Sequence, residues 1–188
     1  MVCTKPCYIL FAGANGTGKT TLYKMHPEYQ NLPRINTDEI VREYGNWQDL
    51  SNQLKAGRKA VKLLKAYFDD NVTFNQETTL CGRSILENIK KARNLGYKVE
   101  IHYIGVESVD ICKERIGKRV AVGGHGIPDE DIERRYVDSL MNMKKVLPLC
   151  DRVYFYDNSE SFTLAAISEN GCIDIICDEV PEWLKEIL

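Results

Sequence analysis

The chain has 188 residues, a length that favours one domain built around a single hydrophobic core. Its 25 basic and 27 acidic side chains leave a net charge of -2 without any long basic run, which disfavours nucleic-acid binding. The longest apolar runs are too short to span a bilayer and the N-terminus lacks a signal-peptide pattern, so we expect no membrane association.

The cysteines and histidines predict neither a disulfide scaffold nor a zinc site. The seven cysteines form no C-x-x-C pair, and their odd number favours reduced thiols in a cytoplasmic protein. The three histidines, His26, His102 and His125, have no companion ligands at the spacing of a metal site.

The stretch over residues 7–21 reads CYILFAGANGTGKTT and predicts a phosphate-binding loop. Residues 8–12 are an apolar run of the length of a buried parallel strand, and the following residues complete the P-loop pattern G-x4-G-K-[ST]. Glycines let backbone N–H groups surround phosphate oxygens, Lys19 places a cation near the β- and γ-phosphates, and the Thr20 hydroxyl is a ligand for Mg²⁺. The predicted nucleotide-binding residues are Gly13, Ala14, Asn15, Gly16, Thr17, Gly18, Lys19, Thr20 and Thr21.

The segment after the P-loop brings a carboxylate to the same edge of the predicted sheet. A short helix over residues 20–25 should end at His26-Pro27, because the residue before proline is disfavoured in a helix. A brief strand then ends near Asn36, and Thr37 or Asp38 caps a helix that runs to about residue 44. Asp38 therefore follows a strand and is either a helix cap, a group that activates an acceptor hydroxyl, or both.

Residues 47–70 predict a long amphipathic helix. Its expected buried stripe consists of Trp47, Leu50, Leu54, Val61, Leu64 and Phe68, with Gly57 in the one missing step. The opposite face carries Lys55, Arg58, Lys59, Lys62 and Lys65, which either attract an anionic substrate or simply face solvent.

A third strand is expected over residues 72–79, so that Glu77 and Thr78 join Asp38 at the edge that carries the P-loop. A helix over residues 82–95 closes at Gly96, and a fourth strand covers residues 98–105. Ser108 is expected to cap a helix that continues to about Arg119.

The glycine-rich stretch over residues 119–128 predicts a lid. Pro128 begins the next helix, to about residue 147, and three acidic residues fill its first turn, where the helix dipole favours them. Arg119, Arg134 and Arg135 flank this loop, so a lid over about residues 119–135 would bring cations to a triphosphate. The alternative is a surface loop with solvated arginines.

The C-terminal part predicts a fifth strand over residues 151–157, a hairpin around Asn170-Gly171, and a helix after Pro181 that buries Trp183. We expect the fifth strand at the sheet edge, and Asp157 is therefore left out of the metal site. Together the elements predict an α/β, three-layer P-loop NTPase or kinase fold. Its mostly parallel five-stranded sheet is followed by a C-terminal β-hairpin and helix, in a single domain over residues 1–188.

The segments AGANGTGKTT, INTDEI, QETT, RVAVGGHGIPDEDIERRY and YDNS together resemble the zeta toxin-like P-loop kinases, over about residues 8–159. The chain is most similar to the small, single-domain members of that family. The resemblance implies ATP and Mg²⁺ as cofactors and phosphorylation of a hydroxyl on UDP-N-acetylglucosamine or a related nucleotide sugar. It also makes an antitoxin protein a candidate partner.

The resemblance further implies a role for individual residues. Lys19 and Thr20 match the ATP and Mg²⁺ ligands, and Asp38 matches the carboxylate that activates the acceptor hydroxyl. The implied substrate contacts are Glu77 and Thr78, and the implied lid arginines are Arg119 with either Arg134 or Arg135. The basic side chains of Arg58, Lys62, Lys65 and Arg83 are candidates to meet the diphosphate of an anionic acceptor.

Elementary chemistry supports the same function, since phosphoryl transfer needs a phosphate cradle, a divalent cation, a carboxylate near the acceptor hydroxyl and cations at the transferred group. The prediction is an ATP-dependent phosphotransferase with a small-molecule hydroxyl acceptor. The alternative is a regulatory ATPase, or nucleotide switch, that acts through a protein partner. A polynucleotide kinase is disfavoured by the near-neutral charge.

Overall fold

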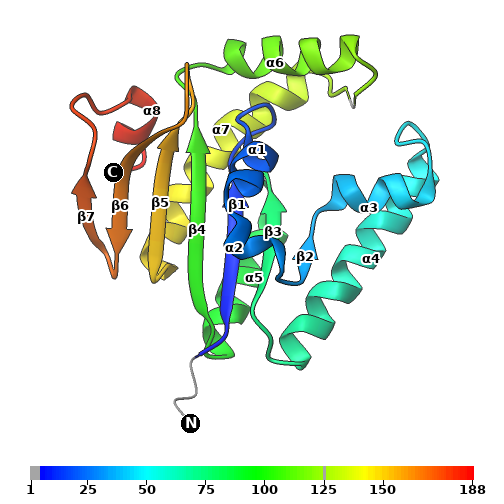
Figure 1. Cartoon of the computed structure of the whole chain (residues 1–188), viewed down its shortest axis with the longest axis horizontal. Coiled ribbons are helices and arrows are strands. Elements are labelled where there is room, and N and C mark those ends of the chain that lie inside the picture. Colours follow the sequence, from blue (N-terminus) through cyan, green and yellow to red (C-terminus); the bar gives the residue numbers. More distant parts are fainter. Residues whose placement is uncertain (1–4, 125) are drawn as a thin grey trace.

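The computed structural model describes residues 5–124 and 126–188, and Figure 1 shows a central sheet with helices on both faces. Seven strands of the described chain form this sheet, in the order β2-β3-β1-β4-β5-β6-β7. The strands are β1 (Cys7–Ala12), β2 (Arg34–Ile35), β3 (Phe74–Thr78), β4 (Lys98–Gly105), β5 (Arg152–Asp157), β6 (Thr163–Glu169) and β7 (Cys172–Ile175). β1 to β5 are parallel, while β6 and β7 are antiparallel, so the predicted α/β P-loop kinase fold with its C-terminal hairpin is confirmed.

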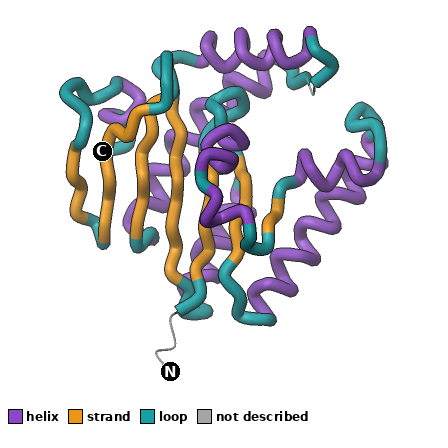
Figure 2. The backbone as a smooth tube through the Cα atoms, viewed as in Figure 1, coloured by secondary structure: helices purple, strands orange, loops and turns teal. Residues whose placement is uncertain are grey.

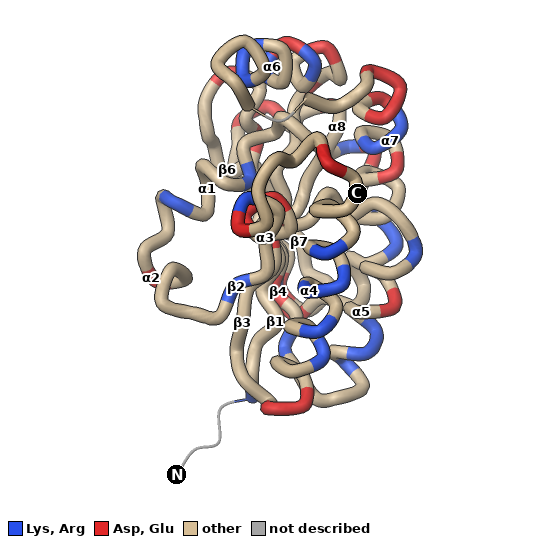
Figure 3. Tube along the Cα trace, turned by 90° about the vertical axis from the view of Figure 1, so that its right-hand side faces the viewer, with Lys and Arg blue, Asp and Glu red and all other residues tan. Residues whose placement is uncertain are grey.

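The helices cover both faces of the sheet. They are α1 (Lys19–Met25), α2 (Pro27–Gln30), α3 (Thr37–Tyr44), α4 (Leu50–Asp69), α5 (Arg83–Asn94), α6 (Val109–Ala121), α7 (Asp129–Val146) and α8 (Glu182–Lys185). Figure 3 shows α1 and α2 on one side of the sheet and α4, α5 and α7 on the other. No helix in the part of the chain that the structure describes is long and apolar enough to cross a membrane.

The alternation of β1 explains these layers. Its Tyr8, Leu10 and Ala12 side chains are fully buried in the larger core, with residues of α4, α5 and α7. Ile9 and Phe11 point to the other face and pack in a smaller cluster with Leu22 of α1. Because β1 is apolar on both faces, it lies at the centre of the sheet.

The sheet register places polar residues of three strands next to the P-loop. β1 and β3 run in parallel with Ala12 paired to Thr78, so β3 ends where the P-loop begins. β2 pairs with β3 through Ile35 and Gln76, which brings the following Asn36 beside Glu77. The carboxyl ends of these strands therefore form one polar edge, where open α/β sheets bind their ligands.

The expected position of β5 at the sheet edge is wrong. The C-terminal hairpin folds back onto β5, so that β5 lies between β4 and β6 and the edge strand is β7 (Figure 2). Asn170 and Gly171 both have positive φ in the hairpin turn, as their sequence predicts. The Asp157 carboxylate accepts hydrogen bonds from Trp183 Nε1 and Ser159 Oγ, both at 2.8 Å, and so anchors α8.

The predicted buried stripe of α4 is only half right, since Phe68 is buried and Leu64 and the preceding Trp47 pack against the core, but the other three members are exposed. Leu50, Leu54 and Val61 are 72%, 63% and 68% exposed, whereas Ala56 is fully buried. The buried face of the helix consists of Asn52, Ala56 and Phe68, beside the half-buried Ala60, Leu63, Leu64 and Tyr67. The small side chain of Ala56 leaves room for close packing, and α3 packs against α4. Apolar residues mark two faces of this helix, so spacing alone selected members of the buried face together with members of an exposed one.

Candidate active site

The loop between β1 and α1 has the close backbone approach of a phosphate cradle. Gly13 has φ of +141°, and a Cβ atom there would lie 2.3 Å from the carbonyl oxygen of Ile104. Two side chains fold back onto the loop, since Thr17 Oγ1 and Lys19 Nζ donate to the Ala14 carbonyl oxygen at 3.0 and 2.7 Å. The loop is thus closed on itself and leads directly into α1.

Lys19 is a buried cation at the centre of this loop. Lys19 as a whole residue is only 8% exposed. Burial lowers the pKa of the Lys19 ammonium, and the nearby carboxylates of Glu77 and Asp38 oppose this shift. An anion bound against the loop would favour the charged form further, so the site is suited to phosphate.

A second contact holds the loop from the C-terminal part of the chain. Asn158, which follows β5 and is buried, donates from Nδ2 to the carbonyl oxygen of Thr17 at 2.8 Å. Its own backbone N–H donates to the Gly105 carbonyl oxygen at 3.0 Å. Sequence reasoning assigned no role to this residue, although it belongs to the YDNS segment, because its partner lies far away in the chain.

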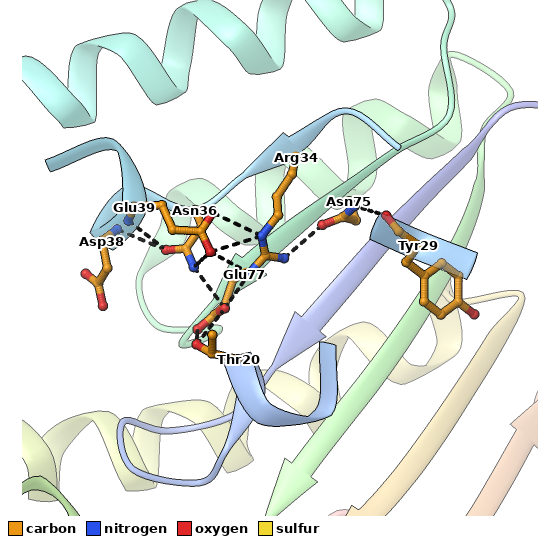
Figure 4. A network of polar contacts seen from close by, with 8 residues as sticks. All are labelled: Thr20, Tyr29, Arg34, Asn36, Asp38, Glu39, Asn75 and Glu77. Carbon is orange, nitrogen blue, oxygen red and sulfur yellow. Dashed lines mark hydrogen bonds and ion pairs between the residues drawn. The ribbon is translucent and has the colours of Figure 1, made fainter. Parts of the chain in front are cut away.

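Glu77 is the centre of a polar network that Figure 4 shows. Its carboxylate accepts from Thr20 Oγ1 at 2.9 and 3.0 Å, from Arg34 Nη2 at 2.8 Å and from Asn36 Nδ2 at 3.0 Å. Arg34 is further held by Asn75 and Glu39, at 2.9 and 3.2 Å. Glu77, predicted as a substrate contact, thus lies against the very hydroxyl that is predicted to bind Mg²⁺.

Asp38 is separate from this network. Asn36 Oδ1 accepts from the backbone N–H groups of Asp38 and Glu39, at 3.0 and 3.4 Å, and is therefore the cap of α3. The helix cap expected at Thr37 or Asp38 is wrong, because the strand ends one residue earlier. The Asp38 carboxylate is exposed, points away from the network in Figure 4, and accepts no hydrogen bond from any described residue.

These groups surround one cavity of about 480 Å³. Its lining comes from the P-loop, α3, the end of β3, α6 and α7, and includes Lys19, Thr20, Asp38, Glu77, Thr78, Arg119 and Arg135. Of the predicted nucleotide-binding residues, Asn15, Gly16, Gly18 and Thr21 also line it. The structure thus brings together most of the predicted site.

Three predicted arginines, Arg58, Arg83 and Arg134, do not line the cavity. Arg134 forms ion pairs on the surface of α7 with Asp131 at 2.6 Å and Asp138 at 3.5 Å. Arg83 is exposed at the first residue of α5. Arg135, in contrast, donates from Nη1 to Asn15 Oδ1 at 3.2 Å, so it is the member of the adjacent pair that contacts the P-loop.

Arg115 is a cavity residue that sequence reasoning missed. It lies one helical turn before Arg119 on α6, and both line the cavity. Its Nη2 donates to the Ser159 carbonyl oxygen at 3.1 Å, while its Nη1 is buried without a hydrogen-bond partner in the described chain. The four-residue spacing within RIGKR is the signal that could have placed both arginines on one face.

The predicted lid begins with a fixed helix end. α6 extends through Ala121. Beyond it, Gly123 has a φ of +84° and donates its N–H to the Val120 carbonyl oxygen at 2.9 Å. Gly124 donates to the Arg119 carbonyl oxygen, also at 2.9 Å. These two hydrogen bonds form a Schellman motif, which fixes the backbone at Arg119. Residue 125 of the predicted lid lies outside the described residues.

Comparisons of the sequence with known proteins identify a family and two relatives. The model of the family AAA_33, described as an AAA domain, matches residues 9–136. An uncharacterised protein of Haemophilus influenzae is 34% identical over 128 residues, which are 68% of this chain and 91% of that protein. An adenylate kinase of Bartonella quintana is 23% identical over 146 residues, or 65% of this chain and 73% of the kinase.

Solved structures share the fold at low sequence identity. The AvrRxo1-ORF1:ORF2 complex with ATP has a TM-score of 0.75 at 16% identity, over 98% of this chain and 64% of that chain. The PezAT chromosomal toxin–antitoxin system of Streptococcus pneumoniae has a TM-score of 0.62 at 20% identity, over 87% and 72% of the two chains. This chain thus spans less than two thirds of the AvrRxo1 chain. An antitoxin partner for it stays a prediction from the resemblance.

Proposed function

The chain belongs to the AAA_33 family of P-loop kinases, and from this premise we propose that it transfers the γ-phosphoryl group of ATP to a hydroxyl of a small molecule. The observation that carries the proposal is the placement of the buried Lys19 and the exposed Asp38 on one cavity. The ammonium group of Lys19 suits a phosphate, and the carboxylate of Asp38 suits the hydroxyl of an alcohol. Switch-type NTPases place a water-orienting polar residue at the γ-phosphate, whereas an exposed carboxylate on this cavity suits an alcohol acceptor.

Asp38 would act on the acceptor. Its carboxylate takes the proton of the acceptor hydroxyl as the oxygen of that hydroxyl forms a bond to the γ-phosphorus. The bond between the γ-phosphorus and the bridging oxygen breaks, and ADP leaves with the electron pair. The products are ADP, a phosphate ester and a proton held at Asp38.

The cationic residues would stabilise the transferred group. Lys19 lies in the P-loop, Arg115 and Arg119 lie on α6, and Arg135 lies on α7 beside Asn15. Positive groups around the three oxygens of a metaphosphate-like group lower the barrier, because charge spreads over these oxygens in the transition state. The Nη1 of Arg115 is buried and has no hydrogen-bond partner among the described residues, so a shift of this side chain toward a bound phosphate would satisfy it.

The residues present also fit Mg²⁺. The Thr20 hydroxyl and the Glu77 carboxylate lie in direct contact, and both are hard oxygen ligands. In proteins that bind nucleotides, Mg²⁺ is held by one or two side chains together with phosphates and water. When bound there, Mg²⁺ would neutralise part of the negative charge of the triphosphate.

The test is to incubate the protein with Mg²⁺-ATP and a metabolite extract, and to search by mass spectrometry for compounds that gain one phosphoryl group. We expect such a product with the wild type and with Lys24→Ala, whose side chain is exposed on α1. Lys19→Ala should form none. Phosphate release without any phosphorylated compound would instead support the regulatory ATPase.

A further inference from the structure

The cavity has an unequal distribution of charge. Its cations are Lys19, Arg115, Arg119 and Arg135, which come from the P-loop, α6 and α7. The other wall comes from the start of α3 and the end of β3, and its described lining residues include no cation. We call the residues Thr37, Asp38, Gln76, Thr78 and Thr79 the acceptor wall.

The acceptor wall offers neutral hydrogen-bonding groups. Thr78 Oγ1 accepts from the backbone N–H of Leu80 at 3.0 Å, so its hydroxyl proton is left to donate. Gln76 Oε1 accepts from the Tyr8 hydroxyl, which leaves the amide NH₂ of Gln76 as a donor. These neutral groups can bond to hydroxyl and amide groups of an acceptor, but they supply no positive charge for a phosphate.

The charges near this wall are negative or already neutralised. Glu77 is paired with Arg34, whose side chain is 11% exposed and bonds to Glu39 as well. Asp38 has no such partner among the described residues, so the acceptor wall has a net negative charge. Arg34 cannot serve a ligand without leaving Glu77 unpaired, which is costly for a partly buried carboxylate.

The basic residues suggested for an anionic acceptor lie elsewhere. Arg58, Lys62 and Lys65 are exposed on α4, whose basic residues are coloured blue along the backbone in Figure 3, and none of them lines the cavity. Arg83 does not line it either. Arg42 lies one turn after Asp38 on α3, but it is exposed and also outside the lining.

We propose that the acceptor is an uncharged hydroxyl compound, such as a polyol or a free sugar, rather than a nucleotide sugar or a phosphorylated metabolite. This inference rests on the proposed kinase function and specifies its acceptor. A phosphate on the acceptor wall would face Asp38 without a cation of its own, and like charges at close range repel each other. The same wall that lets Asp38 receive a proton thus rejects anions.

The experiment passes a metabolite extract through anion and cation exchangers in series, which separates neutral, anionic and cationic fractions. Each fraction is incubated with the full-length protein and Mg²⁺-[γ-³²P]ATP, and labelled organic product is counted. Matched pairs then measure the preference directly. They are glycerol against glycerol 3-phosphate, and N-acetylglucosamine against UDP-N-acetylglucosamine.

We expect the label in the neutral fraction, and a kcat/KM for the better neutral member at least about tenfold above that of its charged partner. Arg42→Ala should leave this preference unchanged. Label mainly in the anionic or the cationic fraction, or loss of transfer in Arg42→Ala, would overturn the neutral acceptor and leave the kinase function standing. Label in none of the three fractions, with ATP still hydrolysed, would overturn the kinase function itself.

Discussion

The phosphate side of the cavity and its acceptor wall differ in how firmly their charged groups are held. On the phosphate side, Lys19 donates to Ala14 O, Arg135 donates to Asn15, and Arg115 donates to Ser159 O. On the acceptor wall, the Asp38 carboxylate has no bond to any described residue. The phosphate side is therefore organised before substrate arrives, whereas Asp38 is oriented only when an acceptor binds. Substitutions on the two sides should fail in different ways.

On the phosphate side, the largest loss of activity is expected from the removal of the Arg119 side chain. Arg119→Ala should lower kcat by about 10³-fold, because a cation that meets the transferred group in the transition state contributes roughly this factor. Its matched control is Arg134→Ala on α7, which should leave kcat unchanged since Arg134 is paired with Asp131 and Asp138 outside the cavity. Steady-state kinetics on both variants measures this. Equal losses of kcat in the two variants would contradict the assignment of Arg119, rather than Arg134, to the transferred group.

A smaller effect is expected from the glycines at the end of α6. A Cβ at Gly124 would lie 2.5 Å from Arg119 Cγ and 2.8 Å from its carbonyl oxygen, so Gly124→Ala must displace Arg119. We expect kcat to fall by about tenfold, which corresponds to about 1.4 kcal/mol. Gly117→Ala on the same helix is the control, because a Cβ there meets nothing within 4 Å.

A variant that combines Gly124→Ala with Arg119→Ala tests whether Gly124 acts by positioning Arg119 or by maintaining the structure in general. If Gly124 acts only through Arg119, then Gly124→Ala should add almost nothing to the loss already caused by Arg119→Ala. Full additivity of the two losses in kcat would show that Gly124→Ala damages the enzyme by another route.

The smallest effect concerns the support of the P-loop by Asn158. Asn158→Ala leaves the Thr17 carbonyl oxygen without its buried donor, so the free energy of unfolding should fall by about 1–3 kcal/mol. The KM for ATP should rise, while the preference among acceptors stays the same. Urea denaturation and ATP titration test both parts, and a changed acceptor preference with an unchanged KM for ATP would contradict the division of the cavity.

The sequence predicted those features that depend on neighbouring residues. The P-loop, the strand Lys98–Gly105 and the Asn170-Gly171 hairpin were all predicted, because motif, alternation and turn chemistry are local. The role of Asn158 was not, since its bond to Thr17 joins residues that meet only in the folded sheet. The cap of α3 was missed by one residue, because Asn36, Thr37 and Asp38 are all able to cap a helix.

The errors on α4 and β5 have the same origin. A helix of 20 residues with apolar side chains on two faces does not reveal which face its neighbours will cover. The position of β5 within the sheet depends on the hairpin folding back onto it, which no residue of β5 encodes. The choice between Arg134 and Arg135 likewise required the position of the P-loop, which only the folded structure supplies.

The central claim is that Asp38 receives the proton of an acceptor hydroxyl on a site that binds ATP independently of it. The most direct measurement is a single-turnover reaction of Mg²⁺-[γ-³²P]ATP with the neutral metabolite fraction, for the wild type and for Asp38→Asn. ATP affinity is measured in parallel by calorimetry. The account predicts that Asp38→Asn lowers label transfer to organic product by about 10²–10⁴-fold with an unchanged affinity for ATP. Equal transfer by both proteins, or label found only as inorganic phosphate at the same rate in both, would contradict it.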